Sequence, residues 1–478
     1  MHAALFHSIL VLQTPAPLKE REVVLWSIFR ILGTSIARTY ARGMSKTKPA
    51  HPARTPTVSR ILPDGRMVEL VYSPADRATT FAIWDGKEVA FENEIKINSD
   101  ETLVPVAGSN NLIRHEAIVL PEKSEPYGTP TELVEEIGRY FDRYVVLSDW
   151  FRRVAAYYVL STWVYEAFQE MGYLRVQADW GSGKTRALMV IGSICQKGFF
   201  ASGASTVSPI FHGLNTFRGT LILDEADFRF SDLTAELSKI LNNGTVQGFP
   251  VLRTAFTQKK EFDPRAFHVF GPKIVAMRKS FEDEALESRF ITERMDVLKL
   301  RKDIPINLPP EQKEEARRLR NKLLQYRFDN RFRVQADPNL VDPALSPRTN
   351  QILVPLLSVV ERASDREAIR AAMIVLEEDR IAARAMSIEA ELVDVLGELS
   401  DAETGGPIGI GAIASRLIDR YGRDYDRPIT NRYVGSLLRT RLGLKTYKSH
   451  GVYVVAIDPE RLTSLCERYG ASQESNLN

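Results

Sequence analysis

One segment, Ala178-Asp-Trp-Gly-Ser-Gly-Lys-Thr185, constrains the fold of this chain more than any other feature. The run 174–178 before it favours a strand, and the apolar stretch after it favours a helix. Gly181 and Gly183 let the backbone turn so that its N–H groups point toward phosphate oxygens. The helix N-terminus adds partial positive charge. A strand, a glycine-rich turn and a helix in this order predict a phosphate-binding loop in an α/β fold.

Within this loop, two side chains have distinct expected tasks. Lys184 is expected to reach the β- and γ-phosphates of ATP, and the Thr185 hydroxyl to bind Mg2+. The usual pattern begins with glycine, where this chain has Ala178. Alanine is the smallest replacement, so we expect a slightly altered loop entrance. The alternative is a glycine-rich turn without a ligand. The predicted nucleotide-binding residues are Asp179, Trp180, Gly181, Ser182, Gly183, Lys184, Thr185 and Arg186.

A second segment, Gly219-Thr-Leu-Ile-Leu-Asp-Glu-Ala-Asp227, is an apolar run that ends in carboxylates. Such a run is typical of a buried parallel strand, and ligands bind at the carboxyl ends of these strands. Asp224 is expected to hold Mg2+ through water, and Glu225 to act as general base on the attacking water. The alternative is a buried strand whose acidic residues at the end only contact solvent and bind no ligand.

These two segments resemble the Walker A and Walker B elements of the AAA+ family of ATPases. The segment Glu284-Ala-Leu-Glu-Ser-Arg-Phe-Ile291 is similar to the family's Ser-Arg-Phe segment. There an arginine points into the ATP of the neighbouring subunit, so the resemblance implies that Arg289 is an arginine finger. Its task would be to stabilise charge on the transferring phosphoryl group.

Two further segments extend the resemblance. Ser346-Pro-Arg-Thr-Asn-Gln-Ile-Leu353 resembles the sensor-2 segment of the minichromosome-maintenance helicases, which implies that Arg348 contacts the γ-phosphate. The strand expected at 271–277 is placed like the sensor-1 strand, although Met277 and Arg278 stand where the family has Asn, Thr or Ser. The alternative for each arginine is an ordinary solvated surface charge.

The stretch 207–295 also resembles the ATPase part of phage and mobile-element primase–helicases. It contains a segment, 249–270, that favours two strands with a tip at 258–264. In helicases of this kind an inserted hairpin lines the central pore, which implies that Lys259 and Lys260 meet DNA phosphates. A plain surface hairpin is the alternative.

The C-terminal segment favours three helices, over 387–399, 410–421 and 430–442, followed by two strands around Ser449-His-Gly451. This order resembles a winged helix-turn-helix. The segment is locally basic, as expected for DNA binding. Its predicted DNA contacts are Asn431, Arg432 and Arg439 on the third helix and Lys445 and Lys448 on the wing. The alternative is a winged helix that contacts protein.

Composition excludes several other classes of protein. The 478 residues carry 63 Lys and Arg against 61 Asp and Glu, a net charge of +2, so any basic surface is local. Two cysteines, Cys195 and Cys466, cannot form a disulfide scaffold, which favours a reducing, cytoplasmic location. No apolar run approaches the roughly 20 residues that a membrane span needs. No Cys/His cluster has metal-ligand spacing, so nucleotide-bound Mg2+ is the metal implied.

The expected fold class is α/β: a P-loop NTPase (AAA+) core with a parallel sheet, flanked by smaller domains. Met44 is a plausible natural start, so the first residues are expected to be an over-called or disordered extension. The expected domains are 1–56 (this extension), 57–125 (small β-rich domain), 129–305 (ATPase core), 306–386 (helical lid), 387–470 (winged helix) and 471–478 (tail).

The resemblances imply an ATP-dependent DNA helicase or translocase for replication of a phage or mobile element. Its partners would be DNA and further copies of itself in a ring, with a hexamer as one option. Two alternatives stay open: a nucleotide-switched DNA-binding regulator, and a helicase loader or remodeller without unwinding activity.

Overall fold

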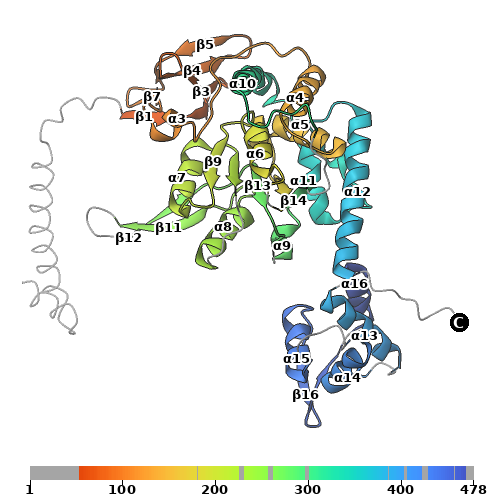
Figure 1. Ribbon diagram of the computed structural model, residues 1–478. Coiled ribbons are helices and arrows are strands. Elements are labelled where there is room, and N and C mark those ends of the chain that lie inside the picture. The colour runs from red at the N-terminus through yellow and green to blue at the C-terminus, as the bar shows by residue number, and fades with distance from the viewer. Residues whose placement is uncertain are drawn as a thin grey trace, which may run out of the picture. The chain divides into compact units, whose positions relative to one another are not determined.

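The computed structural model describes residues 53–179, 181–224, 231–256, 262–281, 283–295, 301–385, 387–402, 406–421, 429–456 and 458–469 (Figure 1). Four predicted site residues lie outside these ranges: Trp180, Glu225, Lys259 and Lys260. The described chain forms two compact units. The first contains 53–57 and 92–105, and the second contains 58–91 and the residues from 106 onward.

The first unit is a small mixed sheet. Strand β7 (Glu101–Pro105) lies in its centre. It pairs in parallel with β1 (Ala53–Thr57) and antiparallel with β6 (Ile95–Lys96).

The second unit begins with a four-stranded sheet in the order β2-β3-β4-β5. Strands β4 and β5 are neighbours in this sheet, and Asp85 and Gly86 lie in the turn between them. The Asp85 carboxylate accepts the backbone N–H groups of Lys87 and Glu88, each at 2.9 Å, and Gly86 has a φ of 102°. A left-handed φ of this kind favours glycine. The elements are β2 (Ser59–Ile61), β3 (Met67–Ser73), β4 (Ala78–Trp84), β5 (Val89–Glu92) and the short α3 (Asn111–Arg114).

The centre of the second unit is a five-stranded sheet in the order β14-β8-β13-β10-β9. All four neighbouring pairs are parallel, which confirms the predicted α/β class with a parallel sheet. The carboxyl ends of all five strands therefore meet at one edge. The strands are β8 (Tyr173–Gln177), β9 (Phe199–Ser202), β10 (Leu221–Asp224), β13 (Lys273–Met277) and β14 (Phe290–Arg294).

Helices pack around this sheet. A capping box forms at the start of α4: Thr129 accepts the Glu132 N–H at 3.2 Å, and the Glu132 carboxylate accepts the Thr129 N–H at 2.8 Å. Both interactions satisfy N–H groups that the first turn leaves unpaired. The helices are α4 (Pro130–Tyr144), α5 (Asp149–Trp163), α6 (Lys184–Gly192), α7 (Val207–Phe217), α8 (Ser231–Asn243), α9 (Glu284–Glu287), α10 (Pro310–Asn330), α11 (Pro347–Leu357) and α12 (Ala363–Ala385).

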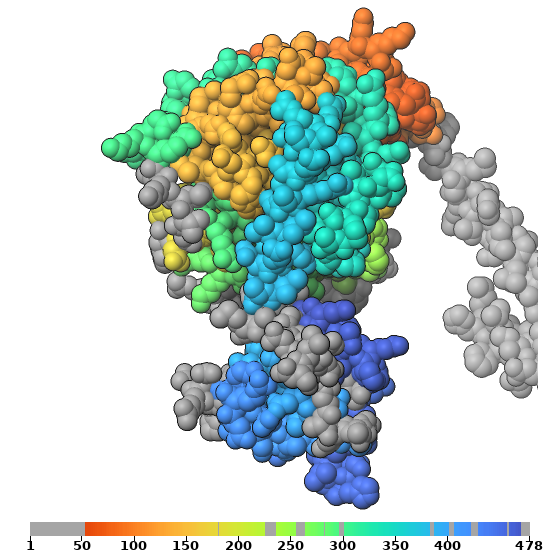
Figure 2. All heavy atoms as spheres, turned by 90° about the vertical axis from the view of Figure 1, so that its right-hand side faces the viewer, coloured from red at the N-terminus to blue at the C-terminus, as the bar shows by residue number. Residues whose placement is uncertain are grey.

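One hydrophobic core joins most of these elements. It contains Met67 and Val71 of β3, Trp163 of α5, Leu323 of α10 and Leu353 of α11, together with residues of the parallel sheet. The β2–β5 sheet and the helices from 310 to 385 therefore share the core of the parallel sheet. In Figure 2, α12 (light blue) runs along the surface against the yellow-orange segment that contains α5, which it contacts.

A buried ion network ties the β2–β5 sheet to this core. The Glu69 carboxylate of β3 lies 2.7 Å from the Arg327 guanidinium and 2.9 Å from Lys197 Nζ. Arg327 also binds Glu166 at 2.8 Å and the Trp163 carbonyl at 2.6 Å. Glu69, Lys197 and Arg327 are nearly completely buried. Because these charges are paired inside the protein, removing one partner would leave an unpaired charge buried in a medium of low dielectric constant, which is destabilising.

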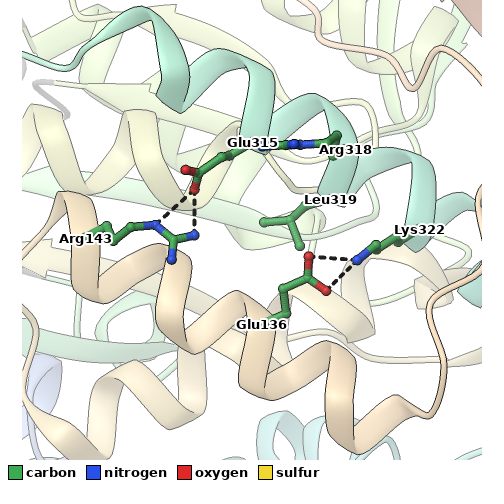
Figure 3. A pocket seen from close by; sticks show the side chains of 6 residues that line it. All are labelled: Glu136, Arg143, Glu315, Arg318, Leu319 and Lys322. Carbon is green, nitrogen blue, oxygen red and sulfur yellow. Dashed lines mark hydrogen bonds and ion pairs between the residues drawn. The ribbon is translucent and has the colours of Figure 1, made fainter.

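A charged hollow of about 420 Å³ lies between α4 and α10 (Figure 3). Two ion pairs cross it, Arg143 with Glu315 at 2.6 Å and Lys322 with Glu136 at 2.7 Å. Leu319 lies between the two pairs in the same view. These charges satisfy one another across a helix contact, so the hollow is part of the packing.

The C-terminal segment has a hydrophobic core of its own, made by residues from Ala390 to Tyr469. The three predicted helices and two predicted strands are present, with a short strand and a last helix in addition. Thr430 caps the third helix, because its side chain accepts the Tyr433 N–H at 3.2 Å. The elements are α13 (Ile388–Ala402), β15 (Ile408–Gly409), α14 (Ile410–Tyr421), α15 (Asn431–Thr440), β16 (Thr446–Ser449), β17 (Val452–Val455) and α16 (Pro459–Tyr469).

Candidate functional site

The glycine-rich segment forms the predicted turn between β8 and α6. Gly181 and Gly183 have φ values of 73° and 89°, so both adopt the left-handed conformation that other residues rarely take. Gly183 is the N-cap of α6, and no side chain caps this helix. The backbone N–H groups of the first turn therefore face the loop, and they form a suitable cradle for an anion.

Ala178, which replaces the first glycine of the usual pattern, is compatible with this loop. Its side chain is 1% exposed and belongs to the main hydrophobic core. Its φ is not positive, so the backbone here does not require glycine. Its N–H donates to the Met277 carbonyl at 3.2 Å, which ties the start of the loop to β13.

The Lys184 ammonium lies in the mouth of the loop. It donates to the carbonyl oxygens of Ala178 at 2.6 Å and Asp179 at 2.5 Å. The Ser182 hydroxyl also donates to the Asp179 carbonyl, at 2.8 Å. An ammonium held beside inward-facing amides fits the phosphate groups of a nucleotide.

The acidic strand meets the loop at the same edge of the sheet. The Thr185 hydroxyl donates to Asp224 Oδ2 at 2.7 Å, although the two residues are 39 positions apart. A hydroxyl and a carboxylate are hard oxygen ligands of the kind that Mg2+ prefers. In the described part of the chain no group of three His, Cys, Asp or Glu residues could hold a metal alone. The pair therefore fits a Mg2+ ion that arrives with phosphate oxygens of its own.

Strand β13 lies between β8, which leads into the phosphate loop, and β10, which ends at Asp224. Met277 at its end is buried, and Gln177 donates from its side chain to the Arg278 carbonyl at 3.2 Å. This position, beside the loop and next to β10, is where the resemblance expects sensor 1. The Arg278 side chain is half-buried.

Arg289 lies at the opposite edge of the sheet from Lys184. It directly precedes β14, whose Phe290 pairs with Tyr173 at the start of β8. The phosphate loop follows the end of β8, five residues later, or roughly 16 Å at about 3.3 Å per residue. The Arg289 guanidinium donates to the Asn242 side-chain oxygen. Within one chain, Arg289 is thus held away from the phosphate loop.

Arg348 lies close to Arg289. Helix α11, which contains Arg348 in its first turn, packs against the residue before β8: a Cβ on Gly172 would lie 2.7 Å from Ile352. Burial and the charge of Arg348 lower the pKa of Arg289. Burial raises the pKa of Glu170, and the charges of Arg348 and Arg289 oppose that rise. Both arginines and Glu170 therefore gather at the edge opposite the phosphate loop, which we call the arginine edge.

The two predicted hairpin strands are present, but the second begins earlier in the sequence than predicted. Strands β11 (Val251–Phe256) and β12 (Phe262–Phe267) pair antiparallel up to Phe256 opposite Phe262. The prediction that the tip extends to Pro264 is wrong, because Pro264 continues the pairing opposite Thr254. Arg253 faces the protein, where it pairs with Glu236 at 3.1 Å and stacks 4.1 Å from the Phe211 ring.

The predicted DNA contacts of the C-terminal segment are all exposed, on α15, on β16 and at Lys445 directly before β16. Arg439 also has a structural contact, since it donates to Thr446 of β16 at 3.0 Å. His450 and Gly451 form the hairpin turn with φ values of 48° and 88°. The residues concerned are Asn431, Arg432, Arg439, Lys445 and Lys448.

Comparisons with known proteins do not assign a function to this chain, so the function is argued from its own residues. No family model and no curated protein matches the chain. The A-form apo structure of the NrS-1 C-terminal region is 13% identical with a TM-score of 0.34, covering 82% of this chain and 96% of that one. A further apo structure of that region (305–718) is 12% identical with a TM-score of 0.35, covering 82% and 95%. The Aeropyrum pernix ORC1 protein in complex with DNA is 16% identical with a TM-score of 0.19, covering 68% and 93%.

In the part of the chain that the structure describes, no helix is long and apolar enough to cross a membrane.

Proposed function

We propose that this chain is an AAA+ ATPase that acts on DNA as a helicase or translocase. The observation that carries the proposal is the contact between Thr185 and Asp224 at the mouth of the phosphate loop. It joins the two elements that a Mg2+–nucleotide site needs, from segments far apart in the sequence. The replication of a phage or another mobile element is the biological setting that the resemblance implies.

In this proposal the loop amides and Lys184 bind the phosphates of ATP. Thr185 and Asp224 hold Mg2+, which neutralises charge on the phosphates when bound. Glu225 follows Asp224 in the sequence and acts as the general base that orients and deprotonates water. Gly181 and Gly183 supply the backbone turn, and their left-handed φ values support this assignment.

The arginines act between subunits. Arg289 and Arg348 lie at the arginine edge, so neither serves the phosphate loop of its own chain. A neighbouring copy that presents its phosphate loop to this edge receives two positive charges beside its γ-phosphate. Such a head-to-tail contact is heterologous, and it closes into a ring when the rotation between copies closes. The ATP site is thus completed only by assembly.

DNA contact is assigned to two regions. The segment 388–469 has the helix and strand order of a winged helix, and α15 with Arg432 would enter the groove while Lys448 on the wing meets the backbone. The stretch between β11 and β12 in the sequence, which contains Lys259 and Lys260, would contact a strand in the pore.

A second function is supported by the separate core of the C-terminal segment. A winged helix that folds around its own core can bind a duplex site without any motor. The chain would then be a nucleotide-switched DNA-binding regulator, in which ATP sets the assembly state.

The experiment that separates the two functions is strand displacement on forked DNA with ATP and Mg2+. We expect unwinding by the wild type and none by Glu225→Gln, which retains nucleotide and DNA binding. Tight, sequence-specific duplex binding by a wild type that hydrolyses ATP without unwinding would support the regulator and reject the helicase.

A further inference from the structure

A hollow with a mainly apolar lining lies at the arginine edge. Its volume is about 760 Å³, and it is formed by the turn before β8 and the segment 336–355. Val341, on its rim, is 53% exposed. The apolar part of its lining includes Ala336, Val341, Leu345, Val354 and Pro355.

The hollow adjoins the two arginines. Glu170 lines it, and the charges of Arg289 and Arg348 both reach Glu170. Pro347, the residue before Arg348, also lines it. A side chain that fills this hollow therefore lies next to Arg289 and Arg348, the two arginines that are proposed to contact the phosphates of a neighbouring copy.

An exposed isoleucine lies at the other edge of the same chain. Ile306 is 91% exposed, the highest value among the large hydrophobic side chains of the described residues. Its neighbours two positions away face the protein: Ile304 is 7% exposed, and Leu308 packs against the main core. The backbone on both sides of Ile306 is thus anchored, and the isoleucine is held outward.

The position of Ile306 is fixed relative to the phosphate loop. The Arg186 guanidinium donates to the carbonyl oxygens of Pro305 and Ile306. Arg186 lies two residues after Lys184, in the first turn of α6. The exposed isoleucine is therefore displayed beside the nucleotide-binding edge.

We propose that Ile306 of one copy inserts into the hollow at the arginine edge of the next copy. This inference rests on the proposed function and deepens it, because it names the contact that sets Arg289 and Arg348 beside the neighbour's phosphates. The occupant is a second copy of this chain, since an apolar projection and an apolar hollow lie at the two edges that the heterologous contact joins. Charge supports the same pairing: Arg289 and Arg348 lie at the arginine edge, and the nucleotide edge presents Asp224 and, when ATP is bound, its phosphates.

Cysteine cross-linking tests the contact without using ATPase activity. Ile306→Cys and Val341→Cys are made as separate variants, mixed with Mg2+–ATP and treated with a short bis-maleimide. We expect a covalent dimer that contains one chain of each variant, and much less product from either variant alone. Cys195 is buried and Cys466 is half-buried. The wild type, treated with the same bis-maleimide, is therefore the control for cross-linking through these native cysteines. Absence of the mixed dimer would overturn the inference.

Self-association gives an independent measurement. We expect Ile306→Asp to raise the concentration at which half of the chains are assembled at least tenfold in sedimentation velocity. Val341→Asp should do the same from the other side of the contact. Val375→Asp is the matched control, because Val375 is 55% exposed on α12 and lies outside the hollow. ATP-analogue binding by each monomer should be unchanged, which shows that the variants fold.

The two possible failures are distinguishable. A wild type that assembles and hydrolyses ATP, with Ile306→Asp assembling at the same concentration, rejects this contact and leaves the proposed function intact. A wild type that neither binds nor hydrolyses ATP rejects the proposed function, and cross-linking then decides alone whether the contact exists.

Discussion

The Thr185 hydroxyl donates a 2.7 Å hydrogen bond to the Asp224 carboxylate, and this contact joins the first turn of α6 to the end of β10. The parallel sheet makes it possible, because both β8 and β10 end at the same edge with β13 between them. The order of the strands therefore brings the two side chains together. The hydrogen bond between them fixes the position of each oxygen relative to the other.

Replacing either oxygen ligand should weaken binding of Mg2+–ATP. We expect Thr185→Ala and Asp224→Asn to reduce that affinity about 10- to 100-fold, the range typical for groups that hold or orient a metal. Affinity for ATP without Mg2+ should change little, because Lys184 and the loop amides remain. Titration of a fluorescent ATP analogue with and without Mg2+ measures both quantities. Thr185→Ser keeps the hydroxyl and should bind as the wild type does; equal losses with and without Mg2+ would contradict the assignment.

Removing Arg289 should abolish hydrolysis while nucleotide binding persists. We expect the ATPase rate of Arg289→Ala to fall on the order of 10³-fold, the effect expected if Arg289 serves as an arginine finger. Because Arg289 lies at the edge opposite Lys184, we propose that it acts on the neighbour's nucleotide.

Mixing two inactive variants tests that action in trans. In an equal mixture of Arg289→Ala and Lys184→Ala, about a quarter of the interfaces pair an intact loop with an intact arginine, if copies assemble at random. Activity should therefore reappear on mixing. A mixture as inactive as its components would show that Arg289 serves its own chain or has a structural role.

The buried ion network predicts a loss of stability in acid. Burial would raise the pKa of Glu69, but the charges of Arg327 and Lys197 outweigh it and hold this pKa below 4.5. A carboxyl whose pKa is lowered on folding stabilises the protein above its unfolded pKa, and that stabilisation is lost as the pH falls through the folded pKa. The free energy of unfolding should therefore decrease below about pH 4.5.

The matched variant is Glu69→Gln, which cannot ionise. Because it leaves Arg327 and Lys197 without their shared partner, we expect a loss of about 3–5 kcal/mol near neutral pH and a shallower acid dependence. Urea unfolding at several pH values measures both effects. Glu88→Gln, at an exposed turn position, is the control. An acid dependence in Glu69→Gln as steep as in the wild type would exclude Glu69 as its source.

The C-terminal segment should bind DNA mainly through phosphates. We expect Arg432→Ala and Lys448→Ala each to weaken duplex binding and to reduce the salt slope of log K by about 1. Fluorescence anisotropy over a range of salt concentrations measures this slope. Arg420→Ala is a suitable control in the same segment, because Arg420 pairs with Glu398 at 3.3 Å. Slopes that stay at the wild-type value would favour a protein-binding role for this segment.

Local sequence patterns predicted much of the fold. The strand predicted from 174, the glycine-rich turn after it and the three C-terminal helices each depend on neighbouring residues, and each is present in the structure. The tip of the hairpin was placed too far along the chain, because Asp263 and Pro264 favour turns locally while the pairing with β11 keeps them in a strand. Tertiary pairing overrode local preference there.

Long-range features could not be predicted in this way. Asn242, which accepts from Arg289, and Glu170, which lies near both arginines, come from separate segments that only the sheet order brings together. The contact between β3 and α10 is likewise long-range, since Glu69 pairs with Arg327 across 258 residues of sequence. The outward position of Ile306 follows from its anchored neighbours, and the sequence alone gives no sign of it.

The most direct test of the account is the rate of Mg2+-dependent ATP hydrolysis as a function of protein concentration, compared between the wild type and Lys184→Ala. The account predicts a wild-type rate per chain that rises steeply with concentration as interfaces form, and no hydrolysis or nucleotide binding by Lys184→Ala. A wild type without Mg2+-dependent hydrolysis at any concentration, or a Lys184→Ala variant that hydrolyses ATP as the wild type does, would contradict it.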